Sequence, residues 1–328
     1  MATQTKKMPK KQNKFIAAFF RRDVEGKYHM SDGFFGFLLT VPAILVLLTV
    51  IAAPILKGIY MSFMKYGLKE VSGKAAPVWN NFKNYTDLFR AGGINGNVVD
   101  YFLTTLQFVF WAVLVQFAIG LALALLLNTK LKGRGVFRGL FLVPWTIPSV
   151  VVALLWRLML NNSYGIINWI LNKLGFIPTA AFDWLNSPNL ALPAVVIAAV
   201  WRQLPYMMVM LLAGLQSVDK SQLEAARIDG ATFMQTLRHV TLPTIRPVVL
   251  SSVWIAIMNN FQMYTIINLM TGGGPSEATY TLSIAAYEKA FTDYNFGQGA
   301  AIGVMWLVFL TIVTVIINKI SAKSAENL

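Results

Sequence analysis

The sequence contains no cysteine and only two histidines, His29 and His239. The missing cysteines exclude disulfides, thiol catalysis and cysteine-ligated metals, and two histidines do not make a histidine-cluster metal site. No nucleophile–base constellation is visible either. We therefore predict no catalytic residues, no metal site and no cofactor held by this chain.

Charge is also scarce. Only 13% of the 328 residues are Asp, Glu, Lys or Arg, against about 25% in ordinary globular chains. Hydrophobic residues make up 56%, and the mean hydropathy is +0.57. The net charge of +14 would suggest nucleic acid as a partner in a soluble protein. Here the basic residues lie mostly between long apolar blocks, so membrane topology explains them better and we predict no nucleic-acid partner.

Six apolar blocks are each long enough to cross the bilayer as a helix, which needs about 20 residues. They cover residues 34–56, 102–127, 140–160, 190–216, 248–270 and 298–318. Helices are expected because a lipid-exposed segment must satisfy its own backbone hydrogen bonds, and the alternating pattern of barrel strands is not seen. The sequence thus predicts an all-α membrane protein with six spans. Prolines in several blocks predict kinked or irregular helices.

The predicted domains are a basic N-terminal segment over residues 1–33, a transmembrane domain over 34–320 and a tail over 321–328. The first apolar block is longer than the 7–15 residues of a signal-peptide core, so we interpret it as a retained anchor. The basic start has two interpretations. It is either a disordered tail or a short interfacial helix carrying Phe15, Ile16, Phe19 and Phe20.

The basic residues predict the orientation. The N-terminal segment, the second-to-third and fourth-to-fifth connections and the C-terminus together hold 18 Lys and Arg, and the other side holds 8. Basic residues accumulate in cytoplasmic loops. Both termini are therefore predicted to be cytoplasmic, which agrees with an even number of spans.

The connection after the fourth block has the pattern of two short helices. Asp219 with Gln222 fits a capping box, and Gly230 fits a helix stop. Thr232 with Gln235 fits a second capping box. The sequence predicts a compact cytoplasmic helix–turn–helix.

The second of these helices carries an apolar stripe of Phe233, Leu237 and Val240 and should end at Pro243. Such a ridge suits docking into a groove of a partner protein. From the residues alone, an amphipathic loop on the lipid surface explains it equally well.

The same segment resembles the EAA loop of permease subunits in binding-protein-dependent ABC importers. The matching residues are Glu224, Ala225, Ala226, Gly230, Leu242 and Pro243. Val240 stands where that family usually has isoleucine. Other stretches resemble the sugar-importing branch of the maltose and glycerol-phosphate type. They are 81–85, Arg138-Gly139 before Pro144, 271–275, 287–291 and Phe296-Gly297.

This resemblance implies the fold of type I ABC importer permeases, with 219–243 as a coupling loop. It implies that the six matching residues contact a separate ATPase, which uses ATP and magnesium. The chain has no phosphate-binding loop of its own. The implied partners are a second permease, two ATPase subunits, an extracytoplasmic binding protein, a carbohydrate and membrane lipid. The implied location is the inner membrane of a prokaryote.

Polar side chains inside the predicted spans mark a path for cargo, because they are costly in lipid and usually face a cavity. They are Gln107, Gln116, Arg202, Gln203, Tyr206, Asn259, Asn260, Gln262 and Tyr264. In the family the cargo site lies mainly on the helices flanking the EAA loop. The resemblance therefore implies Tyr206, Asn259, Asn260, Gln203 and Met263 as substrate contacts, with hydrogen bonding between helices as the alternative role. For Arg202 we predict a structural ion pair or carbonyl contact, and for Arg157 a snorkelling position.

An ion-coupled secondary transporter of a small polar solute is the alternative function. Such transporters commonly use Asp or Glu within spans as proton relays. None of the 14 acidic residues falls inside a predicted span. This weighs against proton coupling and leaves a sodium site made of carbonyls open.

Overall fold

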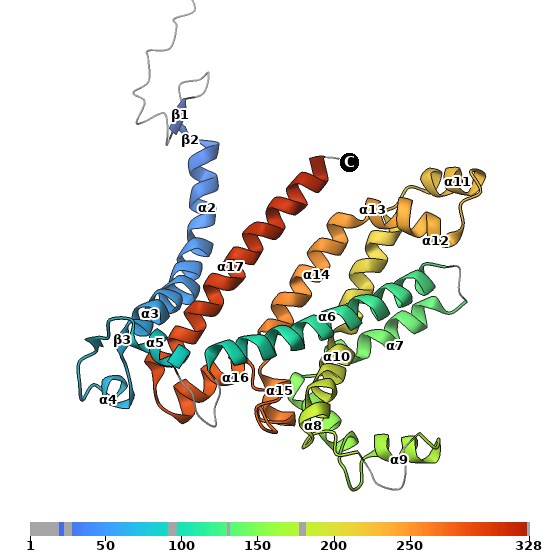
Figure 1. Cartoon of the computed structure of the whole chain (residues 1–328). Helices are drawn as coiled ribbons and strands as arrows, with labels where there is room; N and C mark the ends of the chain where they lie inside the picture. The colour runs from blue at the N-terminus through green and yellow to red at the C-terminus, as the bar shows by residue number, and fades with distance from the viewer. Residues whose placement is uncertain (1–19, 23–27, 91–96, 130–131, 177–181, 327–328) are drawn as a thin grey trace, which may run out of the picture. The chain divides into compact units, whose positions relative to one another are not determined.

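The computed structural model describes residues 20–22, 28–90, 97–129, 132–176 and 182–326 (Figure 1). The chain divides into two units, Met1–Tyr60 and Met61–Leu328. The domain boundaries predicted at residues 33 and 320 stay predictions.

The first unit contains an antiparallel hairpin and most of a long helix. Strands β1 (Phe20–Arg22) and β2 (Tyr28–Met30) pair in the register Phe20 with Met30. Of the predicted interfacial helix, Phe20 lies in β1, and residues 15, 16 and 19 lie outside the described part of the chain. Ser31 caps helix α2 (Asp32–Val46) by accepting the N–H of Phe34.

Helix α2 continues through a π-helical turn, η1 (Leu47–Ala52), into α3 (Ala53–Ser62). Pro54 has no N–H to donate to the carbonyl four residues earlier, and a wider turn is one way to accommodate this. Every side chain of α2 and η1 is at least partly exposed. An apolar helix with such exposure is expected where lipid surrounds it.

Four helices of the described residues are long and apolar enough to cross a membrane. They are the runs Asp32–Ser62, Val98–Asn128 (α6), Pro188–Gln216 (α10) and Phe296–Lys319 within α17 (Phe296–Glu326). Two bent helix pairs pass the same test, so the number becomes six if each pair is one span. Both numbers follow from the length and the apolar composition of the helices.

The centre of the second unit is the packing of α6 against α10. Gly120 of α6 makes this close approach possible, because a Cβ there would lie 2.8 Å from Cγ of Met207. Helices α7 (Arg134–Thr146) and α14 (Arg246–Phe261) also pack on α10. Figure 1 shows α8 (Ser149–Met159) and α9 (Ile166–Lys173) near one end of α10, and α11 (Lys220–Ile228) and α12 (Phe233–Thr236) near the other.

The third predicted span, 140–160, is observed as two helices. Helix α7 ends at Thr146, and α8 (Ser149–Met159) leaves at an angle of 96°. Pro148 is the N-cap of α8 and Ile147 is extended. A proline disfavours the helical conformation of the residue before it, which explains the break.

The fifth predicted span, 248–270, is also divided. Helix α14 ends at Phe261, and α15 (Thr265–Met270) begins after three intervening residues. Side chains donate hydrogen bonds to backbone carbonyls beside this break. Nδ2 of Asn260 donates to the Ala256 carbonyl at 2.8 Å, and Ser283 Oγ donates to the Met263 carbonyl at 3.0 Å. Such bonds offer the backbone an alternative to the helix.

The region between the first two long helices packs on the start of α17. It comprises β3 (Met64–Lys65), α4 (Leu68–Val71), β4 (Val78–Trp79) and α5 (Lys83–Arg90). Asn84 donates to the carbonyls of Ser62 and Met64 at 2.9 and 2.8 Å. A Cβ at Gly297 would lie 2.6 Å from the Met64 carbonyl oxygen. The stretches 81–85 and 296–297 therefore hold this corner together.

Helix α16 (Leu282–Tyr287) continues into the π-helical turn η3 (Glu288–Thr292), and both pack on α17. A buried hydrogen bond joins the start of α16 to α6. The N–H of Leu282 donates to Thr105 Oγ1 at 2.9 Å.

Candidate functional site

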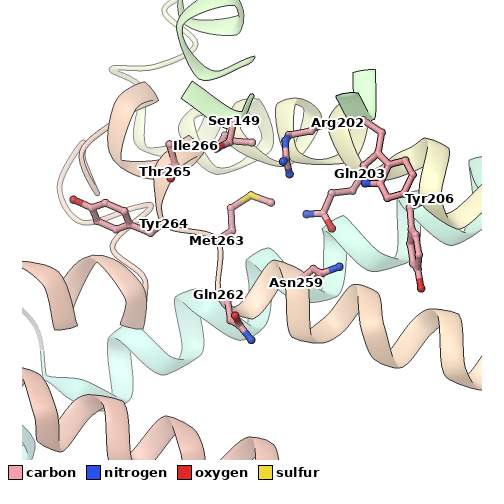
Figure 2. A pocket seen from close by; sticks show the side chains of 11 residues that line it. Ser149, Arg202, Gln203, Tyr206, Asn259, Gln262, Met263, Tyr264, Thr265 and Ile266 are labelled. Atoms are coloured by element: carbon pink, nitrogen blue, oxygen red, sulfur yellow. The ribbon is translucent and has the colours of Figure 1, made fainter. Parts of the chain in front are cut away.

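A polar cavity lies where the two helix breaks meet α10. Its volume is about 410 Å³. The lining residues are Trp145, Ser149, Arg202, Gln203, Tyr206, Asn259, Gln262, Met263, Tyr264, Thr265 and Ile266. Figure 2 shows Arg202 and Gln203 of α10 directed toward Met263 and Asn259. Irregular backbone at membrane depth is tolerated where it lines such a cavity.

Four of the five predicted substrate contacts line this cavity: Tyr206, Gln203, Asn259 and Met263. The fifth, Asn260, lies behind the wall with 1% of its surface exposed. The one-residue step along α14 from Asn259 turns its side chain by about 100°. The structure thus gives the two neighbouring asparagines different surroundings.

Asn260 is the middle of a buried amide chain that joins three helices. Gln203 of α10 donates to Asn260 Oδ1 at 3.2 Å, and Asn260 Nδ2 lies 3.3 Å from Gln116 Oε1 of α6. Gln116 is 1% exposed. This is the interhelical bonding that the sequence left open as an alternative, and it fixes Gln203 at the cavity wall.

The cavity wall combines aromatic rings with neutral polar groups. The Trp145 and Tyr206 ring centroids are 6.0 Å apart. Tyr264 packs against Tyr287 with ring centroids 4.6 Å apart and ring planes tilted by 33°. Sequence reasoning missed Trp145 and Ser149 as lining residues, although the Pro144 and Pro148 pair beside them marks the break that brings them there.

The structure describes the contacts of the two arginines in the predicted spans, and the snorkelling position of Arg157 stays a prediction. Arg157 Nη1 donates to the Leu269 carbonyl at 3.3 Å, near the C-terminal end of α15, where a cation is favoured. Arg202 lines the cavity, and its Nε atom is buried without a hydrogen-bond partner among the described residues. The predicted ion pair or carbonyl contact of Arg202 is not formed within the described part of the chain.

The segment 219–243 forms a helix–turn–helix. Asp219 caps α11 (Lys220–Ile228) by accepting the Ser221 N–H at 2.9 Å, and this bond lowers the pKa of Asp219. Gln222 is not part of that cap, and its Oε1 lies 3.5 Å from Thr244 Oγ1. Gly230 has φ of +75°, and the N–H groups of Gly230 and Ala231 bond back to Arg227 and Ala226. This is a Schellman stop.

The second helix begins with the predicted capping box. Gln235 Oε1 accepts the Thr232 N–H at 2.8 Å, and Thr232 Oγ1 accepts the Gln235 N–H at 3.4 Å. It runs through α12 (Phe233–Thr236), the π-helical turn η2 (Leu237–Thr241) and α13 (Leu242–Thr244). The helix thus continues one residue beyond Pro243, where the sequence predicted its end. In the wider turn the Leu242 N–H donates to the Leu237 carbonyl.

The apolar stripe on this segment is divided between the interior and the surface. Leu237 is buried, Val240 is half-buried and Phe233 is 67% exposed. Ile228 and Met234 are also exposed, at 85% and 63%. Of the residues matched to the EAA loop, Ala226 is buried and Leu242 half-buried, whereas the exposed members are Glu224, Ala225, Gly230 and Pro243.

Apolar spans, two of them broken around a polar cavity, define the chain as a membrane transport protein. Residues 116–326 match the family described as binding-protein-dependent transport system inner membrane component, and the chain belongs to that family. It is therefore a multi-pass membrane permease subunit, without the ATPase site of the importer.

Several relatives share about a third of their residues with this chain. The trehalose/maltose transport system permease protein MalF of Thermococcus litoralis is 34% identical over 288 residues, which cover 87% of this chain and 92% of that protein. The arabinooligosaccharides transport system permease protein AraP of Bacillus subtilis is 32% identical over 290 residues and 88% of each chain.

The fold also matches a solved structure. A chain of the bacterial alginate ABC transporter, in complex with an alginate pentasaccharide-bound periplasmic protein, aligns with a TM-score of 0.73 and 21% identity. The alignment covers 88% of this chain and 94% of that one. The all-α membrane fold of an ABC importer permease, predicted from the sequence, is confirmed.

Proposed function

We propose that this chain forms, together with a second permease, the translocation path for a carbohydrate that an extracytoplasmic binding protein delivers. The observation that carries the proposal is the cavity of about 410 Å³ lined by Gln203, Asn259, Tyr206 and Trp145. Amide groups pair with sugar hydroxyls, and aromatic rings pack on the C–H faces of sugar rings. The named cargoes of the trehalose/maltose and arabinooligosaccharide relatives are in keeping with this assignment.

The helix–turn–helix of α11 and α12 is the proposed contact with the ATPase. Ile228, Phe233 and Met234 expose a large apolar surface beside the charged residues Glu224 and Arg227. Exposed apolar groups of this size mark an interaction site. In this role Glu224 contacts the ATPase, and the turn at Gly230 brings the two helices together. ATP and magnesium are used in the partner ATPase subunits.

The proposed location is the inner membrane of a prokaryote, with both termini in the cytoplasm. The excess of basic residues around 130–138 and 220–246 supports this orientation. The solved alginate transporter is in complex with an alginate pentasaccharide-bound periplasmic protein. For this chain the binding protein, the second permease and the two ATPase subunits are proposed partners.

Uptake into sealed vesicles containing the assembled importer tests the function. We expect accumulation of carbohydrate from a mixture of neutral and acidic mono- to tetrasaccharides, detected by mass spectrometry, when ATP is supplied on the cytoplasmic side. Ionophores that collapse proton and sodium gradients should leave this uptake intact. Uptake that ignores ATP and stops with the ionophores would establish the ion-coupled alternative, which the family assignment does not favour.

A further inference from the structure

Arg202 is a charged residue in the interior of the apolar helix α10. It is the middle residue of α10, fourteen residues from Pro188 and fourteen from Gln216. At about 1.5 Å per residue, this is roughly 21 Å from either end of the helix. A charged side chain at this depth is costly and is retained where it faces a cavity or a partner.

Arg202 is also the lone charged residue in the lining of the cavity as described. The other ten lining residues are neutral. The buried Nε has no hydrogen-bond partner among the described residues. Figure 2 shows the guanidinium directed into the space between α10 and the break after α14. An uncompensated cation therefore faces the proposed path of the cargo.

The partial charges at the helix ends around the cavity do not neutralise Arg202. Ser149 is the first residue of α8, whose N-terminus carries a partial positive charge. Asn259 and Gln262 lie at the C-terminal end of α14, which carries a partial negative charge. Each is equivalent to roughly half an elementary charge. The two oppose each other, and the full charge of Arg202 remains.

We propose that Arg202 receives an anionic group on the cargo, so that the transported carbohydrate carries a carboxylate, sulfonate or phosphate. The planar guanidinium presents paired N–H donors that match such groups. Gln203, Asn259 and Tyr206 then contact the hydroxyls and ring of the same molecule. This inference rests on the proposed carbohydrate-import function and adds the charge of the substrate to it.

The first test measures the charge of the cavity in the assembled importer. The chain has no native cysteine, so Ser149→Cys gives a single thiol in the cavity wall of this chain. The rates at which an anionic and a cationic methanethiosulfonate modify this thiol are measured, and each rate is divided by the rate of the same reagent with free cysteine. The ratio of the two normalised rates reports the charge of the cavity, because a change in the thiol pKa affects both rates equally and cancels.

A positive cavity should favour the anionic reagent by roughly tenfold, the size expected for unit charges about 5–7 Å apart in water. The preference should disappear with Arg202→Gln and persist with Arg202→Lys. If the ratio of anionic to cationic modification rates is near one in the Ser149→Cys chain that keeps Arg202, and Arg202→Gln does not change it, an acidic group of the second permease neutralises Arg202. That result overturns the proposal even if the Arg202 variants assemble poorly.

The second test identifies the cargo class in cells. Strains with and without this chain are grown on a hydrolysate containing neutral and acidic oligosaccharides, sulfonated sugars and sugar phosphates. Mass spectrometry then reports which solutes disappear from the medium. Acidic sugars should be taken up only with the chain present, with at least tenfold loss for Arg202→Gln and partial retention for Arg202→Lys. Uptake of neutral sugars alone overturns the charge inference, whereas no chain-dependent carbohydrate uptake overturns the proposed function itself.

Discussion

At the scale of single residues, two neighbouring asparagines have separate roles. Asn259 is exposed in the cavity, and Asn260 is buried in the chain of amides that joins Gln203 to Gln116. A buried amide that loses its partner leaves that partner unsatisfied, at about 1–3 kcal/mol. The adjacent positions therefore allow transport and stability to be tested separately.

Asn260→Ala should lower the stability of the permease by about 2 kcal/mol, because it removes three hydrogen bonds of the buried side chain. Asn259→Ala should leave stability within about 0.5 kcal/mol and reduce uptake. Thermal unfolding of the detergent-solubilised importer and ATP-driven uptake are the two measurements. Equal melting temperatures for both variants would contradict the structural role of Asn260.

At the scale of elements, the crossing of α6 and α10 depends on small side chains. Gly120→Val should destabilise the chain by about 1–3 kcal/mol, since the new side chain meets Met207 in a packed core. Gly303→Val is the matched control, because nothing lies within 4 Å of a Cβ at that position on α17. Protease resistance and melting temperature of the membrane-extracted complex measure the difference. Similar losses for both variants would show that helix propensity alone is responsible.

The turn between α11 and α12 carries a prediction on coupling. Gly230→Asp should block uptake and release the ATPase. The left-handed conformation, at φ of +75°, costs about 1 kcal/mol for a non-glycine residue, although no atom lies within 4 Å of a new Cβ. A carboxylate desolvated in a docking groove costs several kcal/mol more.

Gly230→Asn is the control for that experiment, because asparagine bears the same backbone cost and tolerates this conformation without adding charge. It should retain more uptake and more ATPase on co-purification than Gly230→Asp. Full ATPase binding by both variants would remove this turn from the contact and restore the lipid-surface interpretation of the segment.

At the scale of the whole molecule, labelling of single cysteines tests the predicted orientation of the chain in the membrane. Single cysteines at Lys74 and Ser163 should react with a membrane-impermeant maleimide in intact cells. Cysteines at Lys10, Lys132 and Lys323 should react only after the membrane is opened. The reason is the distribution of 18 and 8 basic residues between the two sides. Reaction at Lys10 or Lys323 in sealed cells would reverse the predicted topology.

The sequence by itself determined the class of the molecule. Long apolar blocks specify helices that cross a membrane, because lipid offers the backbone no hydrogen bonds. The capping box at Thr232 and the stop at Gly230 are local effects and were found where the sequence predicts them, whereas Asp219 caps its helix without Gln222, the predicted partner. The polar positions 203, 206 and 259 could be recognised as cavity residues because polar groups in apolar spans are costly, whereas Met263 was predicted from the family resemblance.

Only the tertiary structure decided which polar residues face the cavity and which hold helices together. Asn259 and Asn260 look alike in sequence, and their roles differ through a rotation of about 100° against neighbours on α6 and α10. Trp145 and Ser149 reach the cavity because the third span bends by 96°. Only the folded structure shows that no acidic side chain of the described residues lines the cavity beside Arg202, because the fold sets which distant segments meet there.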